Sequence, residues 1–83
     1  MRYHPGVVVS LDKLRPGTRA TIAAIHGDCS ALQRLLEMGL LEGTPIEYLR
    51  VALLGDPIEG RLGDALVTLR RREAACVEVT PCP

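Results

Sequence analysis

A helix end that leads directly into a series of short strands is the feature that most constrains the fold. A leucine stripe between residues 32 and 36 has helical spacing. It is followed by Gly39, and glycine readily takes the left-handed conformation found just past a helix end, with Leu40 placed to fold back on Leu35. The sequence therefore predicts one helix over residues 30–38 that ends at Gly39.

The same kind of local pattern predicts how the helices begin. Ser30 and Gln33 have the spacing of a capping box, in which both side chains satisfy backbone amides of the first turn. A single helical turn is also expected after Ser10, which would cap it, because Leu11 and Leu14 are spaced to meet on one face.

Turn signals divide the rest of the chain into short strands. Pro57 biases Asp56 toward an extended backbone, and Gly55 supplies any positive φ that this turn needs. The Gly-Asp pair at 63–64 fits a two-residue hairpin loop. Strands are then expected at residues 18–25, 44–52, 58–62, 65–70 and 76–79, with a tight turn at 72–75. About five strands with one inserted helix, after a short N-terminal helical turn, predict a mainly β fold: a small SH3-like antiparallel barrel.

Length and composition favour a single small domain. The chain has 83 residues and neither Phe nor Trp, so Leu, Val and Ile must supply a thin core. We expect one domain over residues 1–83, with flexible ends at 1–10 and 80–83. Ten basic and ten acidic residues cancel, which removes the positive field typical of proteins that bind phosphate backbones. No nucleic acid partner is expected.

The N-terminal region contains no targeting or membrane signal that we can identify. Its apolar run at residues 7–9 is too short for the hydrophobic part of a signal peptide or for a membrane span. We therefore expect a cytoplasmic protein that is not inserted directly into a membrane.

The cysteines show neither of the two common cysteine patterns. Cys29, Cys76 and Cys82 are odd in number and include no Cys-x-x-Cys pair. A disulfide framework and a zinc knuckle are both disfavoured by this arrangement, and reduced thiols are the simpler expectation.

One loop nevertheless holds candidate metal ligands. His26, Asp28 and Cys29 place an imidazole, a carboxylate and a thiol close together in the sequence. A structural zinc site normally needs four convergent ligands, and the others would have to come from distant positions such as His4. We therefore expect no cofactor and no tight metal site in the monomer, while weak transition-metal binding stays open.

Nothing in the chain has the pattern of a catalytic site. Ser10 and Ser30 are interpreted as helix caps, and no nucleophile elbow or glycine-rich phosphate loop is present. The basic run at residues 70–72 is most simply a solvated turn at a strand end. The sequence predicts a protein that is not an enzyme.

Two pairs of adjacent leucines, at 40–41 and 53–54, suggest a surface for protein contact. Neighbouring residues of a strand point to opposite faces, so at least one leucine of each pair is expected at the surface. Covering the open end of the barrel is the alternative role. The candidate partner-binding residues are Leu41, Leu53 and Leu54, with Arg50 and Arg61 as a polar rim.

From about residue 11 to residue 79 the sequence resembles the ferrous iron transport protein A family (FeoA). The resemblance is carried by the segments 38–44, 54–58 and 69–74, in that order and at that spacing. Leu53 is a departure, because the family usually has a proline there. The resemblance implies an SH3-like barrel and an accessory or regulatory role in bacterial ferrous iron uptake. Its implied partner is the membrane ferrous iron permease, protein B, which contains a GTPase.

Two other functions stay open. One is a metal-sensing module, because the same barrel forms the C-terminal domain of iron-dependent transcriptional repressors. It would need a separate regulator as partner, because no DNA-binding helix-turn-helix is evident. A metallochaperone would require the loop of His26 and Cys29 to bind metal. A homo-oligomer is compatible with each of these functions.

Overall fold

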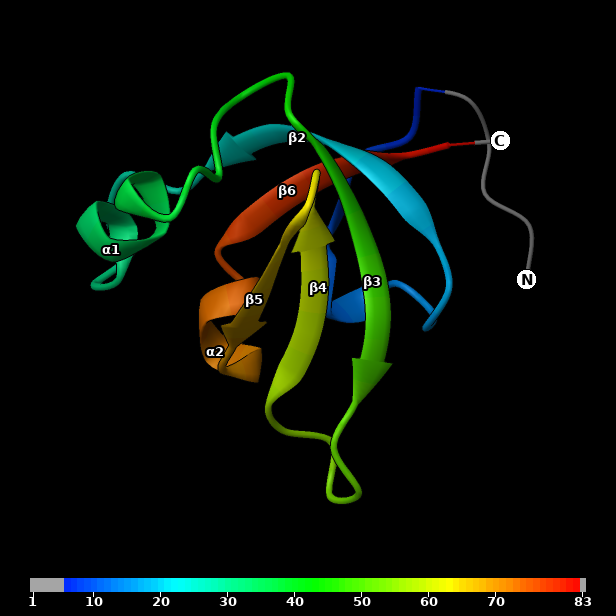
Figure 1. Ribbon diagram of the computed structural model, residues 1–83. Helices are drawn as coiled ribbons and strands as arrows, with labels where there is room; N and C mark the ends of the chain where they lie inside the picture. The colour runs from blue at the N-terminus through cyan, green and yellow to red at the C-terminus, as the bar shows by residue number, and fades with distance from the viewer. Residues whose placement is uncertain (1–5, 83) are drawn as a thin grey trace.

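The computed structural model describes residues 6–82, so residues 1–5 and 83, among them the candidate ligand His4, lie outside the described part. Its strands form one antiparallel sheet in the order β1-β6-β2-β3-β4-β5, curled into a small barrel (Figure 1). The elements are β1 (Val9–Ser10), the 3-10 helix η1 (Leu11–Lys13), β2 (Arg19–Ile25), α1 (Leu32–Glu37), β3 (Pro45–Val51), β4 (Ile58–Leu62), β5 (Ala65–Leu69), α2 (Arg71–Ala74) and β6 (Val77–Pro81). The predicted class of fold is confirmed.

The strand β1 was not expected from the sequence. Val9 of β1 pairs with Val79 of β6, and β6 itself continues to Pro81. Residues 9–10 and 80–81 thus belong to the sheet rather than to flexible ends. A two-residue strand is too short to show an alternating pattern, which is why sequence reasoning missed it.

The core lies inside the curled sheet and consists of aliphatic side chains together with one tyrosine. Its largest fully buried members are Tyr48, Leu11, Ile22, Leu35, Leu40, Ile58, Leu69, Val77 and Val79. Leu11 and Leu14 of the η1 region are both buried, as their spacing predicts. Every strand from β2 to β6 contributes at least one buried side chain, so the core depends on the whole sheet.

The predicted start of α1 is wrong. The helix begins at Leu32 after an N-cap at Ala31, and no side chain caps it. The preceding turn is formed by the Leu32 N–H, which donates to the Cys29 carbonyl at 3.1 Å, and Ser30 is exposed. Gln33 donates instead to Glu37 Oε1 at 2.9 Å. The turn at Cys29 places the helix start two residues later than the capping-box pattern suggests.

Ser10 occupies the N-cap position of η1, as predicted, but its side chain does not cap the helix. Ser10 lies in β1 opposite Glu78, and its side chain makes no cap hydrogen bond to η1. Pairing with β6 places this residue in the sheet, so its extended backbone reflects strand formation.

The end of α1 is as predicted. Gly39 has φ of 99°, its N–H donates to the Leu36 carbonyl at 3.0 Å, and the Leu40 N–H donates to the Leu35 carbonyl at 3.1 Å. Leu35 and Leu40 are both completely buried. This hydrogen-bond pair with its apolar contact is a Schellman motif, which turns the chain from α1 toward β3.

Changing Gly39 to valine is expected to lower the free energy of unfolding by about 1–2 kcal/mol, because a β-branched residue is strained at positive φ. A Cβ at this position would meet only Leu62 Cδ1, at 3.9 Å, so the cost is conformational rather than steric crowding. Urea unfolding of Gly39→Val measures it. Gly27→Val is the matched control, since no atom lies within 4 Å of a Cβ there and its φ is not in the left-handed region. If Gly27→Val and Gly39→Val lowered the free energy of unfolding equally, the cost could not be assigned to the positive φ at Gly39.

Candidate docking loop and its surroundings

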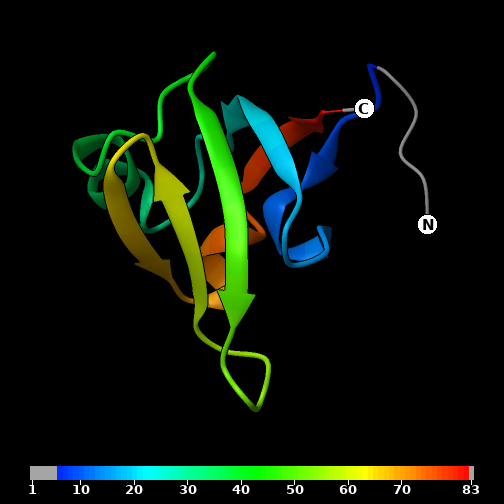
Figure 2. The same cartoon turned by 45° about the vertical axis from the view of Figure 1, so that its right-hand side comes forward.

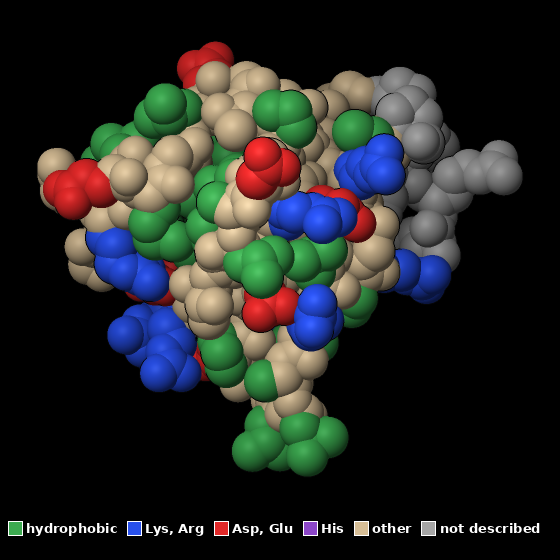
Figure 3. Space-filling model, viewed as in Figure 1, with side chains coloured by type: hydrophobic (Ala, Val, Ile, Leu, Met, Phe, Trp, Pro, Cys, Tyr) green, Lys and Arg blue, Asp and Glu red, His purple; other side chains and the backbone are tan. Residues whose placement is uncertain are grey.

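The loop between β3 and β4 presents two leucines to solvent. The Gly55 N–H donates to the Ala52 carbonyl at 2.8 Å, which closes a four-residue turn with Leu53 and Leu54 at its two central positions. Leu53 is 99% exposed and Leu54 is 93% exposed. The loop projects beyond the ends of β3 and β4 (Figure 1), and the space-filling view shows an apolar group at the same lower end of the molecule (Figure 3). We call residues 52–57 the leucine loop.

The base of the leucine loop is tied to the rest of the barrel by Arg71. Arg71 Nε donates to the Gly55 carbonyl at 2.7 Å, and Nη1 donates to the Asp12 carbonyl at 2.8 Å. The backbone N–H of Arg71 donates to Asp56 Oδ1 at 2.9 Å. Gly55 has φ of 87°, as its turn requires. These bonds anchor the base of the leucine loop to α2 and η1, and the two leucines lie just beyond that base.

Arg71 also closes one end of the barrel. The edge strand β1 leads into η1, and the opposite edge strand β5 is followed by α2. The bond from Arg71 to Asp12 joins these two segments at their ends. The prediction that residues 70–72 form a plain solvated turn is therefore wrong for Arg71, which is partly buried, although Arg70 and Arg72 are exposed.

The two arginines proposed as a polar rim lie in cross-strand ion pairs. Arg50 Nε lies 2.8 Å from Glu59 Oε1, and Arg61 Nη2 lies 2.9 Å from Glu47 Oε1. Arg50 is next to the last residue of β3, so its pair borders the leucine loop, whereas Arg61 lies farther along β4. The arginine side chains are 71% and 47% exposed. Exposed ion pairs of this kind stabilise a fold by about 0–1 kcal/mol. Either arginine could therefore leave its glutamate and pair with a charged group of a partner at little cost.

The structure does not bring Leu41 together with the leucine loop. Leu41 is 52% exposed and lies between α1 and β3. All seven residues of β3, a length of roughly 20 Å at about 3.3 Å per residue, separate it from the loop. The turned view shows the two ends of β3 on opposite sides of the barrel (Figure 2). A single apolar surface containing all three leucines is therefore ruled out.

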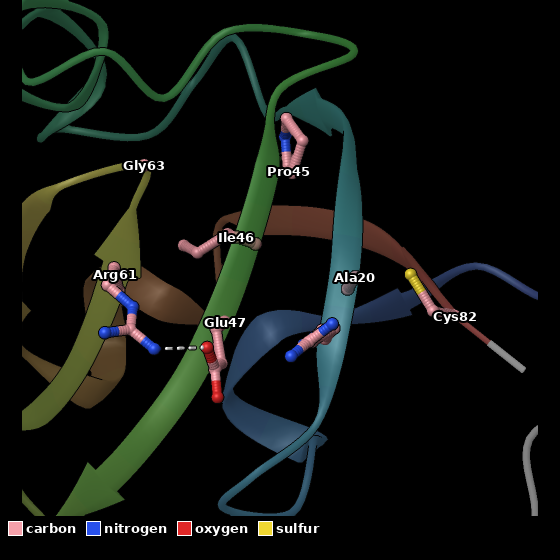
Figure 4. A pocket seen from close by; sticks show the side chains of 8 residues that line it. Ala20, Pro45, Ile46, Glu47, Arg61, Gly63 and Cys82 are labelled. Atoms are coloured by element: carbon pink, nitrogen blue, oxygen red, sulfur yellow. Dashed lines mark hydrogen bonds and ion pairs between the residues drawn. The ribbon is translucent and has the colours of Figure 1, made fainter.

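A shallow pocket of about 200 Å³ lies beside Arg61, and no pattern in the sequence indicated it. Figure 4 shows Arg61 paired with Glu47 on one side and Cys82 beyond β2 on the other. Ala20, Pro45 and Ile46 are among the residues between them. Arg61 and Glu47 are paired with each other, whereas Arg19 also lines the pocket, so the pocket offers apolar surface together with one further guanidinium group.

The candidate metal ligands do not form a cluster. Among residues 6–82, no group of three or more His, Cys, Asp or Glu side chains is arranged to hold a metal ion. Cys29 is instead bonded to Cys76, with the two Cα atoms 6.0 Å apart, while Cys82 is an exposed free thiol. His26 and Asp28 are exposed on the same loop.

The expectation of three reduced thiols is corrected by this disulfide. The two cysteines are 47 residues apart in the sequence, so their spacing reveals nothing about their distance. Pairing of β2 with β6 brings them together, and the His26 N–H extends that ladder by donating to the Cys76 carbonyl at 3.0 Å.

No helix in the described part of the chain is long and apolar enough to cross a membrane.

Comparison with known proteins identifies the family. The FeoA domain profile matches residues 9–81. A fusion of Fe(2+) transport protein A with the Fe(2+) transporter FeoB from Porphyromonas gingivalis (strain ATCC BAA-308 / W83) is 39% identical over 69 residues. These residues are 83% of this chain but only 8% of the fusion protein, so the chain spans a small part of that curated relative.

Solved structures agree with the sequence match. The FeoA protein from Chlorobium tepidum is 35% identical with a TM-score of 0.82, over 90% of this chain and 71% of that one. The zinc complex of FeoA from Stenotrophomonas maltophilia, described as a procaryotic SH3 domain protein, is 26% identical with a TM-score of 0.71, over 83% and 86% of the two chains. Since the profile covers most of the sequence and the fold agrees, the chain belongs to the FeoA domain family, which is involved in ferrous iron transport.

Proposed function

We propose that this protein is a cytoplasmic accessory component of bacterial ferrous iron uptake that binds the membrane transporter FeoB. The fusion relative supports this partner, because it carries the corresponding domain in one polypeptide with FeoB. When two binding partners are joined by a short flexible linker, each meets the other at an effective concentration in roughly the millimolar range. The proposed role is binding, and it requires no chemical reaction.

The observation that carries the proposal is the nearly complete exposure of Leu53 and Leu54 on an ordered turn. Apolar surface removed from water contributes about 25 cal/mol per Å², so covering both leucines favours association. The hydrogen bonds from Arg71 already fix the loop, so little conformational freedom is lost on binding. The Arg50–Glu59 pair beside the loop supplies a polar border.

Replacing Leu53 and Leu54 together by glutamate is expected to weaken binding to the cytosolic part of FeoB from the same organism about tenfold or more. Each leucine would lose its apolar contact, and two added charges would oppose burial. Calorimetric titration measures the affinity, and the urea midpoint checks that the fold is kept, since exposed side chains contribute little to stability.

Leu41→Glu is the matched control, because Leu41 is exposed but lies at the other end of β3. Its affinity for FeoB is expected to equal that of the unchanged protein. Unaltered binding by the double variant would remove the leucine loop from the interface. An equal loss with Leu41→Glu would place the contact elsewhere.

Partner capture from the native membrane under iron limitation, with and without ferrous iron, separates the proposed role from the alternatives. Recovery of FeoB supports the accessory role. Recovery of a DNA-binding regulator in place of FeoB would support the metal-sensing module.

A further inference from the structure

The Cys29–Cys76 disulfide joins two segments at points where each leaves the sheet. Cys29 lies in the loop between β2 and α1, and Cys76 lies between α2 and β6. The Cys29 carbonyl accepts from the Leu32 N–H just before α1. The bond therefore attaches the start of the α1 segment, residues 26–44, to the wall of the barrel.

Few other contacts hold the α1 segment. Leu35 and Leu40 insert into the core. Arg34 Nη1 lies 2.6 Å from Glu73 Oε2, and Arg34 Nη2 donates to the Thr68 carbonyl at 3.3 Å. These contacts all lie at or after the middle of α1. Before the helix, the His26 N–H donates to the Cys76 carbonyl at 3.0 Å, and the disulfide and the partly buried Ala31 hold the residues between this bond and the helix start.

Small molecules can reach the disulfide. Cys29 and Cys76 are partly exposed and line a solvent-open pocket of about 430 Å³ together with Ser30, Arg34 and Arg72. Glu73 also lines the pocket and is paired with Arg34, so the remaining positive charge in the wall is that of Arg72, which attracts anionic reagents such as the thiolate and carboxylates of a glutathione-type peptide. Thiol–disulfide exchange requires this kind of access to a sulfur atom.

We propose that Cys29 and Cys76 are a reversible thiol–disulfide modification site whose state determines how firmly α1 is held to the barrel. The co-reactant is a low-molecular-weight disulfide. One protein thiolate attacks it, forms a mixed disulfide and releases one small thiolate. The second protein thiolate then attacks the protein sulfur of that mixed disulfide and releases the other. Two protein thiols are oxidised and one small disulfide is reduced to two thiols, and excess thiol reverses both steps. The proposal does not depend on FeoB binding.

The test uses the full chain carrying Cys82→Ser, which removes the exposed free thiol. The protein is equilibrated with mixtures of oxidised and reduced glutathione, alkylated, and weighed by mass spectrometry. We expect no alkylated thiol under oxidising mixtures and two under reducing ones. Hydrogen exchange of amides in residues 30–41 is expected to be about tenfold or more faster after reduction, with β3 and β4 unchanged.

The variant with both Cys29→Ser and Cys82→Ser should show the faster α1 exchange in every mixture. If that variant does not fold, the Cys82→Ser protein reduced with dithiothreitol supplies the same comparison. Disulfides formed only between molecules, or thiols that stay alkylatable in every mixture, would overturn the proposal. The proposal would also be overturned if reduction left the hydrogen exchange of the α1 amides unchanged. It would be overturned as well if reduction accelerated amide exchange equally throughout the barrel.

Discussion

Replacing Leu35 by alanine is expected to lower the free energy of unfolding by about 2–5 kcal/mol, because it leaves a cavity in a tightly packed core. Leu35 and Leu40 are both completely buried, and both belong to the motif that ends α1. Small domains are stable by only about 5–15 kcal/mol, so this loss is a large part of the total. Urea unfolding followed by far-ultraviolet circular dichroism measures it.

The neighbouring Leu36→Ala is the control. Leu36 lies on the same helix but is 40% exposed, so its truncation should cost less than about 1 kcal/mol. Similar losses at the two positions would mean that α1 is not anchored through Leu35.

Arg71→Met is expected to cost about 1.5–3 kcal/mol and to loosen the leucine loop. The side chain keeps its approximate length but loses the hydrogen bonds to the Gly55 and Asp12 carbonyls. Charge-assisted hydrogen bonds are each worth about 1.5–3 kcal/mol, and partial exposure reduces their sum. Urea unfolding gives the stability, and hydrogen exchange at residues 53–57 reports the mobility of the loop.

Arg72→Met is matched to this variant in chemistry and position. Arg72 is exposed, and its contact with Cys76 Sγ uses the backbone carbonyl, which the substitution leaves in place. A change of less than about 0.5 kcal/mol is expected. If Arg72→Met destabilised the protein as much as Arg71→Met, charge at this turn rather than the specific bonds would be responsible.

Local signals in the sequence predicted local structure well. Gly39 ends a helix and Gly55 serves a turn because each meets a backbone requirement that neighbouring residues reveal. The hairpin at 63–64 follows from the same logic, and Leu62 and Ala65 pair across it. The capping box at Ser30 failed because a turn formed by a more distant constraint, at Cys29, took precedence.

The features that sequence reasoning missed depend on contacts between distant parts of the chain. Arg71 looks the same as its neighbours in the sequence, and only the approach of the leucine loop and of η1 distinguishes it. Cys29 and Cys76 pair because β2 and β6 are adjacent.

The two leucine pairs differ in how much of their placement is local to the sequence. At least one exposed leucine was predicted at 53–54, and both are exposed because they lie in a turn beyond the end of β3, while the separation of Leu41 from that loop required the position of β3. Their role in partner binding stays a prediction.

The place of β6 in the sheet has a consequence for synthesis of the protein on the ribosome. Among the strands of residues 6–82, β6 is the last in sequence, yet it lies between β1 and β2, which are not neighbours in the sheet. A nascent chain that has emerged only through β5 therefore lacks β6, the strand that pairs with β1 in the described part of the chain, and leaves one edge of β2 open. Unpaired edges of this kind are prone to wrong association. The cell must therefore produce this barrel through an interval in which its core is still accessible, and that interval ends only when residues 77–81 leave the ribosome.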